Sequence, residues 1–146
     1  MPCDFLLYNV LRVTNNGGIN GGCMRKLTSH KLNGLNDALE ITVLDEPGQG
    51  NASHLYGVNK NPSDSDAPMM CLVHFQNGPI QESGVNGISN EALLAIVEDR
   101  LIGFQSGQFA CSENAVALTK IQEAMMWLQK RTRDRLARGV EGTSQK

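Results

Sequence analysis

The sequence lacks the features that mark several large classes of protein. No stretch approaches the roughly 18 to 20 consecutive apolar residues that a membrane-spanning helix needs. The apolar patch at residues 5–8 has no basic flank before it and no long apolar run after it, which is unlike a signal peptide. The four cysteines include no CxxC pair, and the three histidines show no HxxxH or HxxE spacing. We therefore expect a soluble intracellular protein with no disulfide framework, no metal site and no bound cofactor.

Catalytic motifs are also missing. The chain has no Ser-His-Asp arrangement, no Gly-x-Ser-x-Gly, no P-loop and no His-x-Glu accompanied by a cysteine pair. Glu98 and Asp99 are adjacent carboxylates, but successive residues of a helix diverge by about 100°, so the pair is typical of surface charge. The sequence therefore favours binding without turnover, and we expect that the protein is not an enzyme.

Charge and aromatic residues are sparse and unevenly placed. The chain has 146 residues, which suits one domain, with 19% charged residues, 5% aromatic residues, 40% hydrophobic residues and a net charge of −2. Residues 1–100 carry six Lys or Arg and eleven Asp or Glu, a net of −5, whereas residues 101–146 carry seven and four, a net of +3. A basic end on an acidic chain predicts a local anion site and disfavours DNA and RNA as partners.

The first half of the chain predicts a small sheet after an irregular beginning. Asn and Gly gather within residues 15–22 without apolar periodicity, so we expect residues 1–31 to be a flexible or disordered extension. Short strands are expected at residues 38–44, 52–58 and 69–75, with a fourth around 79–85 after the hairpin signal Asn-Gly. Short strands and tight turns over residues 37–86 predict an antiparallel sheet.

The second half predicts two helices that form an antiparallel hairpin over residues 88–138. Ser89 is an expected N-cap for a helix that ends at Gly103. The second helix is expected from about Ser112 to Arg138, with Gly139 as its C-cap. Its apolar residues repeat at spacings of three and four: Leu118, Ile121, Met125 and Leu128. A sheet followed by helices makes the fold α+β, with residues 32–146 as one domain.

Arginines near the end of the second helix form a candidate anion site. Arg131, Arg135 and Arg138 follow at spacings of four and three, so they share one face, and Trp127 lies one turn before Arg131. Two fork-shaped guanidinium groups one turn apart suit a pyrophosphate, because each can donate two hydrogen bonds to phosphate oxygens. The alternative is a solvated last turn, where cations interact favourably with the helix dipole.

The loop between the helices holds the remaining candidate ligand contacts. Phe104 and Phe109 bracket this loop, and an aromatic ring near arginines could stack on a nucleobase. Gln105 lies between them, and Asn114, in the first turn of the second helix, has an amide that can bond to a base or ribose. The alternative is that the two rings anchor the hairpin core and Asn114 only solvates the helix start.

Several short segments together are specific enough to compare with a known family. In the first half they are residues 35–39 (Leu-Asn-Asp-Ala-Leu), 44–48 (Leu-Asp-Glu-Pro-Gly), 75–80 (Phe-Gln-Asn-Gly-Pro-Ile), 84–87 and 90–97. In the hairpin they are residues 103–105, 109–111, 113–115, 117–120, 127–128, 131–133 and 138–143. These segments are similar to those of the phage anti-Thoeris sponge proteins of the first type, and the hairpin resembles that of anti-CBASS sponges. The family motif has proline where this chain has Gln108 and arginine where it has Ser112.

The resemblance implies a protein that binds and sequesters cyclic ADP-ribose isomers, notably glycocyclic ADP-ribose, in the cytoplasm of an infected bacterium. It implies that Phe104 stacks on the adenine, Asn114 fixes the base or ribose, and Arg131 and Arg135 neutralise the pyrophosphate. Family members form dimers with recessed pockets at the subunit interface, and some form hexamers that hold cyclic di- or trinucleotides at separate sites. An enzyme that hydrolyses the same signal is the alternative. No DNA, RNA or membrane partner is expected.

Overall fold

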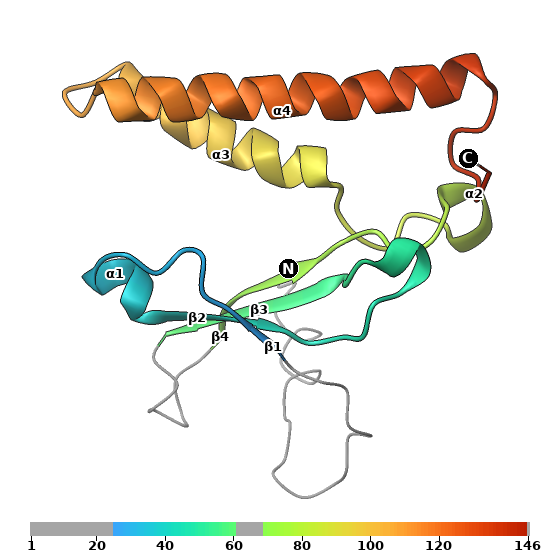
Figure 1. The fold of residues 1–146 in the computed structure, drawn as a ribbon, viewed down its shortest axis with the longest axis horizontal. Helices are drawn as coiled ribbons and strands as arrows, with labels where there is room; N and C mark the ends of the chain where they lie inside the picture. The colour runs from blue at the N-terminus through green and yellow to red at the C-terminus, as the bar shows by residue number, and fades with distance from the viewer. Residues whose placement is uncertain (1–24, 61–68, 146) are drawn as a thin grey trace, which may run out of the picture.

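The computed structural model describes residues 25–60 and 69–145, which form a small sheet joined to a long helical hairpin (Figure 1). The sheet has four antiparallel strands in the order β1-β2-β3-β4. Its strands are β1 (Arg25–Leu27), β2 (Leu39–Val43), β3 (Leu55–Lys60) and β4 (Met69–His74). The helices are α1 (Gly34–Asp37), the 3-10 turn η1 (Gln49–Asn51), α2 (Ile80–Ser83), α3 (Asn90–Gln105) and α4 (Ser112–Ala137). The predicted α+β class is confirmed.

The sheet begins earlier than the sequence predicts. β1 pairs with β2, with Arg25 opposite Val43, and the Lys26 ammonium lies 2.6 Å from the Glu40 carboxylate. These contacts place residues 25–27 in the sheet, although the expected extension ran to residue 31. Residues 1–24 of that extension lie outside the described residues, so their predicted flexibility stays a prediction.

The predicted fourth strand around residues 79–85 is wrong. Pro79 precedes the short helix α2, and the segment between Phe75 and Ile88 is a closed loop, not a hairpin. Side-chain amides hold it: Asn86 Oδ1 accepts from Asn77 N at 2.8 Å, and Gln76 Oε1 accepts from Asn86 N at 2.9 Å. Because these amides satisfy the backbone groups locally, the segment needs no strand partner.

The helical hairpin is confirmed with one shifted boundary. Ser89 caps α3, since its Oγ accepts from Ala92 N at 3.1 Å. The helix continues to Gln105, two residues beyond the predicted end at Gly103, because a lone glycine is tolerated inside a helix. α4 ends at Ala137, close to the expected Arg138, which is its C-cap, and Gly139 follows Arg138 with φ +68°. The two helices lie side by side in Figure 1.

Apolar side chains are poorly covered within this one chain. The predicted row of Leu118, Ile121, Met125 and Leu128 is half-buried along the hairpin. Val43 is the one hydrophobic residue that is fully buried among those described. Large apolar side chains on the hairpin are exposed: Ile96, Val97, Ile102, Phe109, Val116, Met126, Trp127 and Leu136. The hairpin therefore leaves many large apolar side chains exposed.

None of the helices in the described part of the chain combines the length and the apolar character that crossing a membrane requires.

Candidate functional site

A cavity of about 710 Å³ lies where the sheet meets the C-terminal end of α4. This volume is within the range of small-molecule sites in proteins, roughly 300–1,000 Å³. The sheet side contributes residues around the start of β3 and the end of β4, and the helical side contributes one face of α4 with the tail that follows it. The residues that line the cavity include His54, Tyr56, Phe75, Glu91, Arg131, Arg135 and Glu141.

Arg131 is the more available of the two predicted anion-binding arginines. Its side chain is 63% exposed, and its Nη2 lies 3.9 Å from Glu91 Oε1, which is a loose ion pair. The same residue lines a second, smaller groove of about 280 Å³ on the neighbouring face of α4, beside Trp127 and Arg138. Its guanidinium can therefore donate to an anion with little loss of existing contacts.

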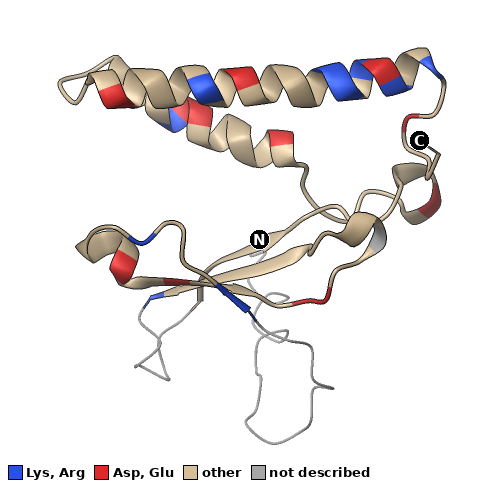
Figure 2. Cartoon of the chain, viewed as in Figure 1, with Lys and Arg blue, Asp and Glu red and all other residues tan. Residues whose placement is uncertain are grey.

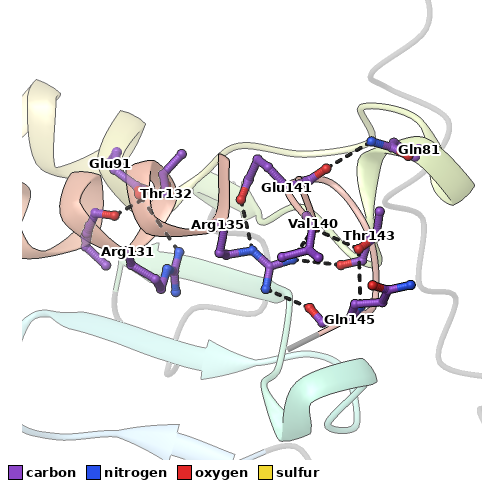
Figure 3. Close-up of polar contacts among 10 residues, drawn as sticks. Gln81, Glu91, Arg131, Thr132, Arg135, Val140, Glu141, Thr143 and Gln145 are labelled. Carbon is purple, nitrogen blue, oxygen red and sulfur yellow. Dashed lines mark hydrogen bonds and ion pairs between the residues drawn. The ribbon is translucent and has the colours of Figure 1, made fainter. Parts of the chain in front are cut away.

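Arg135 is already bonded within the chain (Figure 3). Its Nε donates to Glu141 Oε2 at 2.9 Å, and its Nη2 donates to the carbonyls of Val140 at 2.8 Å and Thr143 at 2.9 Å. Its Nη1 donates to the Gln145 carbonyl at 2.9 Å. Four of the five N–H groups of a guanidinium are thus used, so Arg135 organises the tail that follows α4.

That tail also bonds to α2 and so forms part of the cavity wall. Gln81 Nε2 donates to the Glu141 carbonyl at 2.9 Å, and Gln81 N donates to the Gly142 carbonyl at 3.1 Å. Gly142 has φ +75°, and a Cβ there would come within 2.8 Å of Ile80 Cγ1. The tail reaches α2 this closely because glycine has no side chain and adopts positive φ readily.

The other predicted contacts lie at the tip of the hairpin. The guanidinium carbon of Arg100 lies 5.0 Å from the ring centre of Phe104, and Gln105 Oε1 accepts from Cys111 N at 3.0 Å. Phe109 is 66% exposed. Asn114 is half-buried in the first turn of α4. The tip therefore presents aromatic and amide groups that are accessible to a second molecule.

One chain does not bring the two predicted groups of contacts together. Asn114 and Arg131 both belong to α4 and are 17 residues apart. At a rise of about 1.5 Å per residue they are separated by about 25 Å along the helix. A mononucleotide-sized ligand cannot contact both residues of the same chain at that separation.

The sequence does not predict that residues of the sheet line the cavity. His54, Tyr56 and Phe75 line it, and the Tyr56 and Phe75 rings meet edge to face with centroids 5.7 Å apart. The residues around His54 have the pattern of an ordinary short strand. No motif in the sequence connects them with Arg131, which is 77 residues later in the chain. The sequence predicts strands in this region. No local pattern predicts that the start of β3 and the end of β4 lie close to the C-terminal end of α4.

Local charge is more balanced than the basic count of the helix indicates (Figure 2). Lys130 Nζ lies 2.6 Å from Asp134 Oδ2, and this hydrogen bond holds the pKa of the Asp134 carboxyl below its ordinary value. Around the cavity, Glu91 faces Arg131 and Glu141 faces Arg135. Within residues 25–60 and 69–145, no three His, Cys, Asp or Glu side chains gather to hold a metal ion.

Comparison with known proteins locates the resemblance on the hairpin and the segment before it. Residues 72–133 match the family model described as the Acb2/Tad1 hairpin domain. The chain is also 54% identical over 80 residues to a protein of Bacillus phage SBSphiJ7 named "Thoeris anti-defense 1". That match covers 55% of this chain and 56% of the relative, so the chain spans about half the length of the relative. These findings confirm the predicted resemblance to the anti-Thoeris sponge family.

Proposed function

We propose that this protein, which carries a hairpin of the Acb2/Tad1 kind, is a phage anti-defence protein that counters Thoeris immunity by sequestering its signalling nucleotide. The ligands are cyclic ADP-ribose isomers, above all glycocyclic ADP-ribose, and they are held without being degraded. A held ligand is withdrawn from whatever effector it activates in the infected cell. The match of residues 72–133 to the hairpin domain is the observation that carries this proposal.

The chemistry of the cavity supports an anionic nucleotide as ligand. A cyclic ADP-ribose isomer carries a pyrophosphate, and Arg131 has an exposed guanidinium with one loose partner at 3.9 Å. Bidentate hydrogen bonds from arginine to phosphate oxygens are among the strongest that side chains make. Glu91 and Glu141 form ion pairs with the two arginines, and the phosphates would replace at least the Glu91 contact. Retention of a signal at low concentration requires a dissociation constant near nanomolar, about −12 kcal/mol.

The 25 Å separation within one chain points to a site made by two copies. We infer that the tip of one hairpin, with Phe104 and Asn114, meets the Arg131 end of the other copy. The apolar side chains on the outer surface of the hairpin supply a reason for the copies to associate, since Val116 is 60% exposed and Met126 and Trp127 are 65% and 66% exposed. A homodimer is the smallest assembly that completes such a site, and a hexamer made of three dimers would complete it equally well. Cyclic di- or trinucleotides at a separate site stay a prediction.

Mass spectrometry of released ligand tests the proposal against the enzymatic alternative. The protein is mixed with glycocyclic ADP-ribose, separated from free ligand and denatured, and the released molecule is weighed. If the protein sequesters the ligand, the released molecule has its original mass and its amount matches the number of binding sites. A new mass that accumulates over many turnovers would establish hydrolysis, and the absence of any retained ligand would overturn the proposal.

A matched pair of variants on α4 tests whether Arg131 binds the anionic part of the ligand. Arg131→Ala should weaken binding at least about thirtyfold, because removing one partner of a desolvated charge pair costs about 2–5 kcal/mol. Arg133→Ala is the control, since Arg133 is exposed and lines neither cavity. Equal affinity of the two variants would remove Arg131 from the site.

A further inference from the structure

We propose that the cavity selects its ligand by charge, and that Glu91 is the specificity-determining residue. The cavity accepts a nucleotide whose only ionised group is a pyrophosphate, and it excludes a nucleotide that also carries a phosphate monoester. This inference rests on the proposed function, because it concerns the same cavity and the same anionic ligand. It adds a rule about which cyclic nucleotides the protein binds, which the match to the hairpin domain does not supply.

The lining of the cavity contains as many carboxylates as guanidinium groups. Within the part of the chain that the structure describes, its Lys, Arg, Asp and Glu residues are Arg131, Arg135, Glu91 and Glu141. A site for polyphosphates needs a clear excess of cations, because like charges in a partly closed space repel each other strongly. The described lining has no such excess, so the cavity has a small capacity for negative charge.

One of these two guanidinium groups is available to a phosphate, and the other is already bonded (Figure 3). Arg135 Nε donates to Glu141 Oε2 at 2.9 Å, and three backbone carbonyls of the tail accept from the same guanidinium. Arg131 has a loose contact of 3.9 Å, and its side chain is 63% exposed. The cavity therefore offers one available cation, which suits the one pyrophosphate of a cyclic ADP-ribose isomer.

Glu91 places a negative charge beside that cation. Its Oε1 is the atom that lies 3.9 Å from Arg131 Nη2, and Figure 3 draws the two side chains together. Glu91 lies in the first turn of α3, where the helix dipole stabilises a carboxylate. Its side chain is 24% exposed, so water and salt screen its charge less than that of a fully exposed carboxylate. When a phosphate displaces Glu91 from Arg131, the carboxylate stays close by and repels further negative charge.

The size of the cavity lets this repulsion reach every group of a bound ligand. A sphere of about 710 Å³ is about 11 Å across, which is close to the Debye length of about 10 Å in 0.1 M salt. A phosphate monoester adds about 1.5–2 negative charges at neutral pH. Repulsion of that charge by a partly buried carboxylate should weaken binding at least about tenfold. The pyrophosphate alone is weakened less, because its contact with Arg131 offsets part of the repulsion.

Calorimetry with two probes that differ by one phosphate tests the inference. The probes are glycocyclic ADP-ribose and the same molecule with a phosphate monoester on a free ribose hydroxyl. In about 0.1 M salt the wild-type protein should bind the first probe at least about tenfold more tightly than the second. In Glu91→Gln, which keeps the shape of the side chain and removes its charge, this ratio should fall to about threefold. An unchanged ratio in Glu91→Gln would overturn the inference.

A second carboxylate on α3 supplies the matched control. Asp99→Asn removes the same charge from an exposed position that lines neither cavity. It is eight residues beyond Glu91, or about 12 Å along the helix. The ratio of the two affinities should stay at the wild-type value in Asp99→Asn. An equal fall of the ratio in both variants would mean that the net charge of the protein, and not the position of Glu91, sets the discrimination.

A salt titration of the unaltered protein tests the same inference if a variant fails to fold. The ratio of the two affinities should fall to about twofold in 1 M salt, where the Debye length is about 3 Å. A ratio that salt leaves unchanged would mean that the second probe is excluded by its size, and would refute selection by charge. If the wild type binds neither probe, the proposed function fails and this inference fails with it. Equal affinity of the wild type for both probes would refute this inference alone.

Discussion

A mixture of two inactive variants should recover ligand binding if each site is shared between two copies. Phe104→Ala removes the aromatic end of the site, and Arg131→Ala removes the basic end. The two ends cannot serve one ligand within one chain, because α4 separates Asn114 from Arg131 by 17 residues, or about 25 Å. Each variant refolded alone should therefore retain almost no ligand.

The recovery expected from the mixture can be calculated. A shared site takes its arginine from one copy and its phenylalanine from another, and after random exchange each has one chance in two of being intact. About a quarter of the wild-type sites should therefore return, whether the assembly is a dimer or a hexamer built from the same symmetric contact. The two variants are mixed in urea and refolded together. They are then given free glycocyclic ADP-ribose at a concentration above the dissociation constant of the wild type and well below those of the single variants, and retained ligand is counted by mass spectrometry. Wild-type protein taken through urea is the control.

Three results would refute the reasoning. No recovery after proven exchange would mean that the arginine and the phenylalanine act in the same copy. Undiminished binding by Phe104→Ala alone would remove the hairpin tip from the site. Recovery to the full wild-type level would require that the two substitutions act elsewhere than on shared sites.

Four further predictions concern single positions. Arg135→Ala should lower the free energy of unfolding by about 2 kcal/mol, because hydrogen bonds to charged groups contribute about 1.5–3 kcal/mol and the freed carbonyls regain water; an unchanged urea midpoint would contradict the role in holding the tail. Glu91→Gln should raise ligand affinity severalfold in calorimetry, since it removes the carboxylate 3.9 Å from the anion-binding guanidinium, and a lower affinity would count against competition. Gly87→Ala should destabilise the protein by at least about 2 kcal/mol, because a Cβ would overlap the backbone carbonyl of Phe75; a thermal midpoint equal to that of the wild type would be inconsistent with this packing. Stability should fall as the pH drops below about 4, since the desolvation that raises the pKa of Asp45 is outweighed by hydrogen bonds from the His54 and Leu55 N–H groups, which hold it low in the folded state, and Asp45→Asn should show a smaller fall over that range in urea titrations.

Local patterns predicted the hairpin well and the loop before it poorly. Ser89, Gly139 and the spaced leucines of α4 act over one or two turns, so neighbouring residues are enough to specify them. The Asn77-Gly78 pair favoured a hairpin for equally local reasons. The structure has a closed loop there instead of a hairpin. The side-chain amides of Gln76 and Asn86 hold this loop, and because they are ten residues apart in the sequence they meet only when the loop closes.

The sequence by itself determined that α4 carries arginines one turn apart and that the hairpin tip carries Phe104 and Asn114, because helical periodicity and chain order are local properties. Only the tertiary structure shows which contacts those groups make within the chain and which other residues lie near them. It gave Arg135 to the tail that follows α4, placed Glu91 and residues of the sheet around the same cavity as Arg131, and set the tip about 25 Å from the basic end of the same helix. Those outcomes depend on which distant segments meet in space, and on a rigid helix that keeps its two ends apart.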